Sequence, residues 1–561
     1  MISAEKKHWT DRFPCAVWAN WLVVGIGIVL RLRLYHLNRS LWLDELFLVN
    51  NFTSRSYLEL VGPLEYNQSA GLFFLWLTKS VNHLIGYGEY AFRLAPLLFS
   101  IAALILTVFL ANRCLGKIGS ILAVALMAFS PVQIRYAAEL KQYSCEAFFG
   151  VLILLLAIRI IQEGPRSGDY LLLLIAGAFG IWFATPLVFC LGGAGIVLII
   201  HLIGQGPNQV GARNRGAVAT TDGSHNAISI DGLNAARGRF FPHAPVSHPI
   251  FWMTAICLAW FLSFAGHYLV QLRHLQGYDS LFEYWLKYGG FPKGDPFVSL
   301  EWWFWPFHAF FKLMLRLVGI HGIYNEVLLG TWMALASFVM GVFILMRRKA
   351  WVFMILLAPV SLNMIAAYFH KYPFYGRVML YASPCLIVPI AAFLEYLIDR
   401  VVRSASLFLK IGLSALFLFM AFAIAFPVMV VDSKRFQEGF PIEETRDIMA
   451  YLSRGYRTGD QVYLSSRMSV AWKYYAPRFG LDRVHPMVGI NIRKDYYLYE
   501  EEAREKIMGH SRIWILMARL HSIDRSEKHA KFIDSIEKLG GRLLDKHGSR
   551  KAYVYLFDTQ E

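Results

Sequence analysis

The sequence predicts a polytopic α-helical membrane protein that ends in a small α/β domain outside the membrane. The 561 residues are 56% hydrophobic, with a mean hydropathy of +0.43. Apolar runs of about 18 or more residues, the length needed to cross a hydrocarbon core, recur along most of the chain. After about residue 431 the composition becomes more charged, and short β-like and α-like patterns alternate.

About 11–13 transmembrane helices are predicted, and Lys and Arg at their ends orient them. The basic N-terminus and the stretches "NRCLGK", "RRK" and "DRVVR" (112–117, 347–349 and 399–403) are predicted to face the cytoplasm. The best-defined spans lie near 16–37, 91–112, 118–136, 143–161, 169–185, 187–204, 249–270, 324–346, 350–369, 377–398 and 405–431.

The alternation of these spans requires that two further apolar stretches do not cross. The first, 68–86, is interrupted by Lys79 and by two other polar residues. The second, 306–320, carries Lys312 and Arg316 at helical spacing, which is typical of an interfacial amphipathic helix. The first stretch is therefore predicted to stay within the first external loop without crossing the membrane.

Two domains are predicted. Residues 1–431 form the transmembrane domain, in which 205–248, rich in Gly, Asn and Ala, is predicted to be a disordered cytoplasmic loop. Residues 432–561 form the α/β domain, for which no Gly-rich phosphate loop or nucleophile elbow is present, so support or acceptor docking is expected there. Its strands are predicted at 460–466, 511–518 and 551–558, and its helices at 441–456, 468–479 and 525–540.

The net charge of +16 does not indicate nucleic-acid binding. Basic loops between membrane spans account for much of it, and no basic stripe alternates with aromatic residues. The six cysteines are scattered without CxxC spacing, so neither a disulfide framework nor a zinc site is predicted.

Asp44 and Glu45, in "SLWLDELFLV", directly follow the first span on the predicted external side. Ionised carboxylates are costly beside apolar surroundings, so they are expected to have a partner or a function. One interpretation is an interfacial pair that meets an arginine at the span end, Arg31, Arg33 or Arg39. The other is a carboxylate that takes a proton from a nucleophile, as general bases do.

Two later polar segments share the predicted external face. "YAAELKQY" brings Glu139, Lys141 and Tyr143 to the end of one span, and an ordinary charged turn is the alternative interpretation. "HKYPFYGR" gathers basic and aromatic residues around a proline and ends on an arginine that begins a span, where snorkelling to water is the alternative. Its candidate site residues are His370, Lys371, Tyr375 and Arg377.

Together these segments place carboxylates and cations on one face of the membrane. Cations there can hold a lipid phosphate, while a carboxylate activates a neutral acceptor hydroxyl. This division suits displacement of a phosphate leaving group. Arg273, His274 and Lys293, in the external segment 271–323, are weaker candidates for the same task, and a solvated rim is the simpler interpretation of them.

Four motifs in this order, "LWLDE", "YGEYAFRLAP", "SPVQIRYAAELKQY" and "YPFYGRVMLYASP", resemble the GT-C glycosyltransferases. The resemblance covers roughly 16–431 and is greatest to bacterial members of the protein O-mannosyltransferase and lipid A aminoarabinose transferase superfamily. It implies juxtamembrane helices in the first external loop, a polyprenyl-phosphate-linked sugar donor, and inverting, direct displacement at the anomeric carbon.

Carried over by position, Asp44 matches the catalytic aspartate of that family and Glu45 the second acid. Glu139 and Lys141 match the later acidic and basic positions, and Arg377 matches the arginine expected near the donor phosphate. His370 and Lys371 are its expected helpers. Two departures stand out: "YNQSAGL" replaces the usual "HPPL", and Lys141 replaces an arginine, so the bidentate fork is lost.

The resemblance implies a glycosyltransferase of a bacterial inner membrane that moves one sugar to an extracytoplasmic glycan, lipid or protein acceptor. The alternatives are a polymerase or ligase that uses a polyprenyl-diphosphate donor, and a non-enzymatic lipid-glycan flippase. Three of the carboxylates, Asp44, Glu45 and Glu139, offer an all-oxygen site for Mg²⁺ or Mn²⁺. Because nearby cations can do the same electrostatic work, we expect no obligatory metal.

Overall fold

A computed structural model of the chain describes residues 15–560 except 165, 217–248, 276–278, 296–297, 318–325, 441, 491–496 and 519–522. Its contacts divide the chain into two compact units. The first contains Met1–Tyr35, Ser69–Thr78 and Arg93–Lys434. The second contains His36–Gln68, Lys79–Phe92 and Arg435–Glu561.

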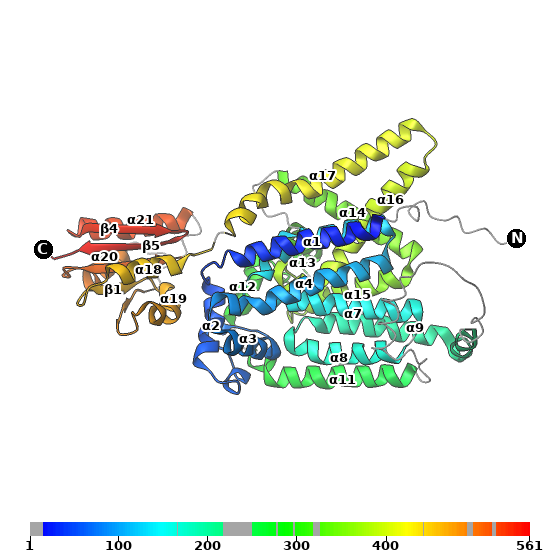
Figure 1. Ribbon diagram of the computed structural model, residues 1–561, viewed down its shortest axis with the longest axis horizontal. Coiled ribbons are helices and arrows are strands. Elements are labelled where there is room, and N and C mark those ends of the chain that lie inside the picture. The colour runs from blue at the N-terminus through cyan, green and yellow to red at the C-terminus, as the bar shows by residue number, and fades with distance from the viewer. Residues whose placement is uncertain are drawn as a thin grey trace. The chain divides into compact units, whose positions relative to one another are not determined.

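The first unit is built from long apolar helices, which confirms the predicted polytopic class (Figure 1). Among the described residues, eight helices are long and apolar enough to cross a membrane, or nine if the bent pair α5–α6 is one span. The apolar helices of this unit are α1 (Cys15–His36), α4 (Glu89–Cys114), α5 (Lys117–Ala128), α6 (Pro131–Ala137), α7 (Tyr143–Glu163), α8 (Ser167–Phe183), α9 (Leu187–Gly216), α11 (Pro249–Val270), α14 (Glu326–Arg348), α15 (Ala350–Tyr368), α16 (Ser383–Arg403) and α17 (Leu407–Glu438).

Each predicted span coincides with one of these helices, except that 118–136 corresponds to the bent pair α5–α6. Helix α8 and the apolar part of α17, Leu407–Phe422, are shorter than a full span. Three other helices, α3 (Leu72–Ile85), α12 (Asp279–Tyr288) and α13 (Leu300–Leu317), are not candidate spans within the described residues. This agrees with the prediction that 68–86 and 306–320 do not cross.

Neighbouring helices pack closely through glycine. Helix α8 lies against α7 and α11, α9 against α15, and α14 against α16 (Figure 1). A Cβ on Gly150 of α7 would stand 2.5 Å from the Tyr381 carbonyl oxygen, and one on Gly341 of α14 would overlap that of Pro389 in α16. Glycine lets the two backbones approach closely. Because lipid tails are as apolar as the side chains, such close van der Waals packing, rather than the hydrophobic effect, holds helices together in a membrane.

Two of the loops predicted to be cytoplasmic, at 113–117 and 347–349, lie at one end of the first unit. Lys349 Nζ donates hydrogen bonds to the carbonyl oxygens of Arg113 and Cys114, at 3.2 and 2.8 Å. The Glu395 carboxylate accepts the backbone N–H groups of Gly116 and Gly119, both at 3.0 Å, at the start of α5. Two basic loops far apart in sequence therefore meet at one end, as the charge pattern predicted.

The second unit contains a five-stranded sheet of order β2-β1-β3-β5-β4 (Figure 1). Strand β1 pairs in parallel with β2 and β3, and β5 pairs antiparallel with β3 and β4. Tyr463 of β1 is in register with Ile515 of β3, which faces Tyr555 of β5. The strands are β1 (Gln461–Leu464), β2 (Met487–Val488), β3 (Ile513–Ala518), β4 (Arg542–Ser549) and β5 (Ala552–Asp558).

The same unit carries helices before and between the strands. They are α2 (Leu43–Ser54), α18 (Thr445–Gly455), α19 (Met468–Tyr475), α20 (Tyr497–Lys506) and α21 (Ile523–Lys538), with short 3₁₀ turns η2 (Glu59–Val61), η3 (Glu65–Asn67) and η6 (Ala476–Phe479). All three predicted strands and three predicted helices of the α/β domain are present. Strand β4 was not predicted, because it is an edge strand with mostly exposed residues and no apolar alternation.

The domain boundary predicted at 431/432 lies close to where the last part of the second unit begins, at Arg435. That unit, however, also takes in His36–Gln68 and Lys79–Phe92 from the first external loop. Helix α9 continues to Gly216, and 217–248 lie outside the described residues, so the disordered loop stays a prediction.

Candidate active site

A cationic cluster forms in the first unit where the α6–α7 turn meets the 3₁₀ helix η5 (Gly376–Ala382). The Arg377 guanidinium hydrogen-bonds to the Tyr136 hydroxyl and lies near enough to Arg135 for the two like charges to repel each other. Arg135 Nε in turn donates to Glu139 Oε1 at 2.5 Å. The structure therefore brings two predicted site residues, Glu139 and Arg377, into one cluster.

Arg135 and Tyr136, which join the two, were not singled out from the sequence. A signal was present: Arg135 precedes Glu139 by four residues, the spacing at which opposite charges meet on a helix. The prediction instead treated Lys141 as the basic residue of the turn. Lys141 is buried, with 7% of its surface exposed, and its backbone N–H donates to the Glu139 carbonyl oxygen at 2.8 Å.

A bend between α5 and α6, of 52°, sets the direction of the α6–α7 turn. Pro131 occupies the first turn of α6, where its missing N–H has no cost. The fully buried Arg31 of α1 donates to the last carbonyls of α5, those of Met127 at 3.2 Å and Ala128 at 3.0 Å. Arg31 thus satisfies the end of α5, a task different from the contact with the acidic pair that was one interpretation of it.

An aromatic wall from α12 supports Arg377. The guanidinium carbon lies 5.9 Å from the Trp285 ring centroid, within the range of a cation–π contact. Tyr375 is buried and packs edge-to-face on the same indole, with centroids 5.7 Å apart. The Phe374 N–H donates to the Gly290 carbonyl at 2.9 Å. The 285–290 segment therefore holds the third predicted segment in place.

The remaining predicted residues of the first unit lie around this cluster. His370 has a φ of 55°, and its Nε2 lies 3.3 Å from the Pro292 carbonyl oxygen, whereas Lys371 is exposed. Tyr143 is buried edge-to-face against Tyr136, with centroids 4.7 Å apart. The weaker candidates Arg273, His274 and Lys293 are all exposed.

Glu146 is a residue that the sequence analysis missed. It lies one turn into α7, is 1% exposed, and interacts electrostatically with Tyr372. Its Oε2 has no hydrogen-bond partner among the described residues. The only sequence signal for a functional role of Glu146 was a carboxylate inside an apolar run. Ionisable residues are uncommon within membrane spans and are usually functional there.

The acidic pair lies in the second unit, in the first turn of α2. Glu45 is fully buried, and its Oε2 accepts the Trp42 backbone N–H at 3.2 Å, which satisfies a donor at the helix start. Asp44 is half-buried in the same turn, where the helix dipole favours a carboxylate. Glu45 therefore has a structural task, and Asp44 is the more accessible acid.

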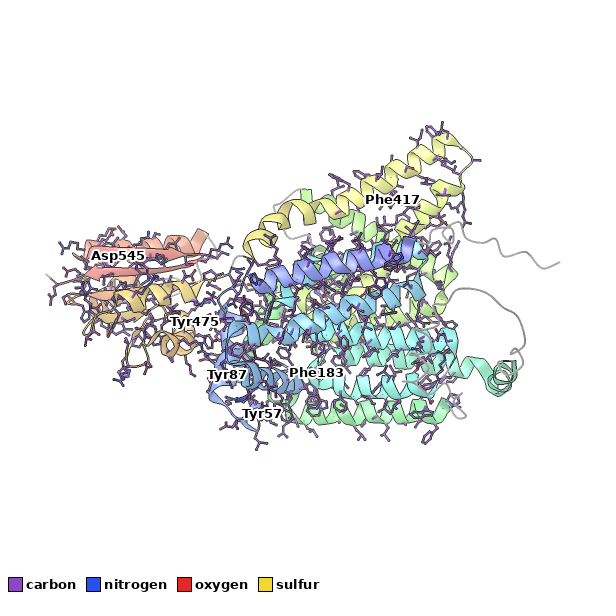
Figure 2. All side chains as sticks on the ribbon, viewed as in Figure 1. Tyr57, Tyr87, Phe183, Phe417, Tyr475 and Asp545 are labelled. Carbon is purple, nitrogen blue, oxygen red and sulfur yellow. The ribbon has the colours of Figure 1, made fainter. Side chains whose placement is uncertain are left out.

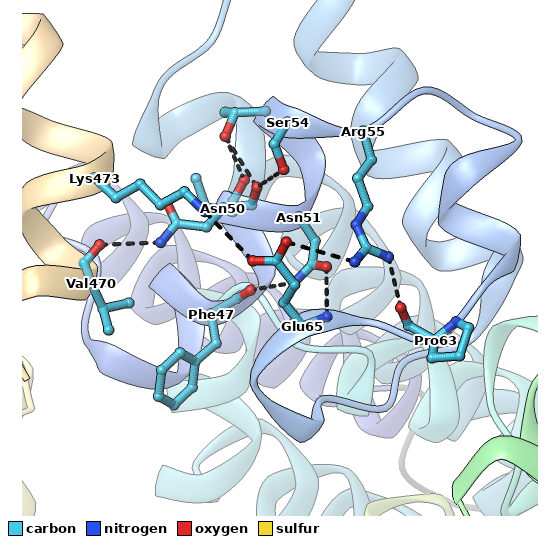
Figure 3. Close-up of polar contacts among 11 residues, drawn as sticks. Phe47, Asn50, Asn51, Ser54, Arg55, Pro63, Glu65, Val470 and Lys473 are labelled. Carbon is cyan, nitrogen blue, oxygen red and sulfur yellow. Dashed lines mark hydrogen bonds and ion pairs between the residues drawn. The ribbon is translucent and has the colours of Figure 1, made fainter.

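Polar contacts fix the rest of α2 (Figure 3). Asn50 Nδ2 donates to the Val470 carbonyl of α19 at 3.1 Å. Glu65 lies between two cations, with Lys473 at 3.5 Å and Arg55 at 3.7 Å, and its N–H donates to Asn51 at 2.9 Å. Segments more than 400 residues apart in sequence thus meet around this helix.

Lys79 of α3, one of the polar residues that interrupt the apolar run 68–86, belongs to the second unit. Its Nζ donates to the Phe52 carbonyl at 2.8 Å and lies 5.6 Å from the Tyr57 ring centroid. Burial lowers the pKa of Lys79, and the charge of Glu59 opposes this. The lysine is thus a helix-end anchor of α2 rather than a residue directed at lipid.

The candidate acid and the candidate cations belong to different units, so their convergence in one pocket stays a prediction. Within the described residues, no group of three or more His, Cys, Asp or Glu side chains is arranged to hold a metal ion. The expectation of no obligatory metal also stays a prediction.

Comparison with known proteins supports the resemblance drawn from the motifs. The sequence model of the family described as dolichyl-phosphate-mannose-protein mannosyltransferase matches residues 69–208, which confirms that resemblance over this segment. No curated protein sequence matches the chain significantly.

Similar solved structures include two of ArnT from Cupriavidus metallidurans. One is in the apo state, at 14% identity over 97% of this chain and 98% of that chain with a TM-score of 0.48. The other is bound to undecaprenyl phosphate, at 13% identity over 96% and 97% with a TM-score of 0.49. Archaeal oligosaccharyltransferase AglB from Archaeoglobus fulgidus, with an inhibitory peptide and a dolichol-phosphate, matches at 12% identity over 98% and 74% with a TM-score of 0.45.

Proposed function

We propose that the chain is a membrane glycosyltransferase that moves a single sugar from a polyprenyl-phosphate donor to an extracytoplasmic acceptor hydroxyl, with inversion at the anomeric carbon. The observation that carries the proposal is the Arg135–Tyr136–Arg377 cluster beside Glu139, at the end of the first unit away from the basic loops. A glycosyltransferase family matches the segment that contains the first two of these residues.

In the proposed reaction Asp44 accepts the proton of the acceptor hydroxyl. The oxygen attacks the anomeric carbon, a new glycosidic C–O bond forms, and the C–O bond to the donor phosphate breaks. The electron pair of that bond stays on the polyprenyl phosphate, whose charge Arg377 and Lys141 stabilise. Fixed cations in a site poor in water favour this charge more than cations in bulk water do.

The main test replaces Asp44 by asparagine, which keeps shape and removes the base. In membranes supplied with a radiolabelled polyprenyl-phosphate sugar, Asp44→Asn should lower transfer by about two orders of magnitude or more. The exposed Glu59, whose carboxylate contacts the Ser56 N–H, provides the control Glu59→Gln with the same change of charge. Full activity of the Asp44→Asn protein, correctly inserted, would end the catalytic assignment.

A second test concerns the donor phosphate. Arg377→Gln should raise the KM for the donor about tenfold or more, since a lost contact to a charged group is worth about 1.5–3 kcal/mol. Arg400→Gln is the control, because Arg400 lies in the last turn of α16, in the basic stretch 399–403 that is predicted to face the cytoplasm. It is exposed, and its Nε donates to the Tyr396 hydroxyl. An unchanged KM would remove Arg377 from the phosphate site. A product with several added sugars would instead indicate a polymerase.

The predicted location is the bacterial inner membrane, with this site on the extracytoplasmic side. Arg113, Lys349 and their neighbours support that orientation, because basic loops are retained in the cytoplasm. Lys371→Cys should react with a membrane-impermeant maleimide added outside spheroplasts, and Lys117→Cys should react only after lysis. The reverse labelling pattern would place the site on the cytoplasmic side of the membrane.

A further inference from the structure

A group of contacts in the second unit holds the segment 38–42, which leads into α2, against the region after the last span. Glu444 accepts from two consecutive residues: Arg39 Nε at 2.8 Å and the Ser40 backbone N–H at 2.9 Å. Arg446 donates its backbone N–H to Ser40 Oγ at 3.2 Å and its Nη2 to the Asn38 carbonyl at 2.7 Å.

Tyr475, the last residue of α19, completes this group. Its hydroxyl accepts the Leu41 backbone N–H at 2.9 Å and donates to Glu89 Oε1 at 3.0 Å. Arg446 Nη1 lies 3.3 Å from the same Glu89 oxygen. Tyr475 is 1% exposed, and Leu41 is completely buried. One hydroxyl therefore joins the entry to α2, the start of α4 and α19.

We refer to Glu444, Arg446 and Tyr475 as the α2 clamp. Its contacts are made to Asn38, Arg39, Ser40 and Leu41, which end two residues before α2 begins. Several of them are made to main-chain atoms, so they fix the path of the backbone and not only side chains. Farther along, Asn50 anchors the second half of α2 to α19. The backbone that leads into α2 and the second half of α2 are therefore both held by the C-terminal part of this unit.

We propose that the C-terminal domain acts as a positioning element for Asp44 through the α2 clamp. This proposal rests on the proposed function, since it assumes that Asp44 is the base. A general base must lie within hydrogen-bond reach of its proton, and a displacement of about 1 Å can cost about 10²-fold in rate. A loop without such contacts is free to move on this scale, and the four anchored residues before the helix restrict that motion.

The clamp is distinct from a purely structural contact in its consequences. A structural contact would, when lost, lower stability and scale down activity in every background. A positioning contact changes the orientation of α2, so its loss lowers kcat while the donor cations of the first unit keep their affinity. Loss of the positioning contact has no further effect on kcat once the carboxylate of Asp44 has been removed.

The variant Tyr475→Phe deletes one hydroxyl and keeps the ring. Tyr451→Phe is the matched control: it removes a hydroxyl of α18 that bonds to Asp545 of β4 at 2.6 Å, and it makes no contact in the α2 clamp. Tyr475 and Asp545 are both labelled in Figure 2. If Tyr475→Phe does not yield folded protein, Glu444→Gln replaces it, since the amide oxygen still accepts one N–H group.

Hydrogen exchange of the full-length protein in detergent tests the geometry without activity. Tyr475→Phe should increase exchange at Leu41 and through the first turn of α2 about tenfold, the effect of losing about 1.4 kcal/mol of protection. Tyr451→Phe should leave this segment unchanged. Equal protection of 41–46 in wild type and Tyr475→Phe would overturn the proposal.

Kinetics then test the coupling to Asp44. Tyr475→Phe should lower kcat about tenfold with an unchanged donor KM, and it should cause no further loss in the Asp44→Asn background. A further tenfold loss in that background would overturn the positioning role. If Asp44→Asn is fully active, the proposed function fails, and the exchange result still decides whether the clamp orders α2.

Discussion

Gly341 of α14 offers a sharp test of how the first unit is packed. A Cβ at this position would overlap the Pro389 carbonyl oxygen of α16, with the Pro389 carbonyl carbon and Cα at 2.5 and 3.0 Å. The obstacle is backbone inside a helix and cannot rotate away as a side chain could. Gly341→Ala must therefore push α14 and α16 apart, and α16 follows directly on the η5 segment that carries Arg377.

The expected cost follows from this contact. Overpacking in a closely packed interior costs about 1–3 kcal/mol, and a fixed backbone obstacle places Gly341→Ala at the upper end. Alanine regains up to about 1 kcal/mol of helix propensity relative to glycine. Gly25→Ala in α1 provides that gain alone, because nothing lies within 4 Å of its Cβ position. The difference between the two variants should therefore be about 3 kcal/mol.

Thermal unfolding of the purified protein in detergent, followed by tryptophan fluorescence, measures this difference. At about 2 °C per kcal/mol, Gly341→Ala should unfold about 6 °C below Gly25→Ala. Gly341→Ser should fall as far, since serine carries the same Cβ. Equal unfolding temperatures for Gly341→Ala and Gly25→Ala would refute the close crossing of α14 and α16.

Three further predictions follow from buried polar groups. Arg31→Lys should lower the free energy of unfolding by about 2 kcal/mol, because lysine keeps the charge but cannot reach all four acceptors of the guanidinium. The control is Arg33→Lys at an exposed position, which should leave the unfolding temperature unchanged in the same thermal measurement. Burial raises the pKa of Glu444, but Arg39 and the Ser40 N–H outweigh it and hold that pKa below its ordinary value. The stabilisation by the ionised Glu444 is therefore complete above a pH of about 4.5 and is lost as the pH falls below that value. The gap in unfolding temperature between wild type and Glu444→Gln should stay constant from pH 7 to about pH 5 and narrow progressively below about pH 4.5. A gap that does not narrow at lower pH would contradict this. Arg135→Gln should raise the donor KM about tenfold, measured by initial rates, and an unchanged KM would exclude Arg135 from the phosphate site.

The sequence by itself determined the class of the fold and the main elements. Apolar runs and basic loop ends are local signals with large energies behind them, since lipid excludes both charge and unpaired backbone. They placed the spans, excluded 68–86 and 306–320 as crossings, and predicted the strands β1, β3 and β5. The edge strand β4 lacks such a signal, because its residues are mostly exposed.

The tertiary structure decided which residues work together. Arg135, rather than a more distant cation, pairs with Glu139, and Glu146 of α7 interacts electrostatically with Tyr372 in the turn after α15. Glu444 meets Arg39 across 405 residues of sequence. The pairing of Arg135 with Glu139 had a local signal in its four-residue spacing, but the other two pairings depend on which distant segments pack together, and the sequence carries no periodic signal for them. Composition and periodicity indicate whether a segment lies in lipid, in water or in the protein interior. Which distant side chains contact each other is decided only when the segments pack together in the folded protein.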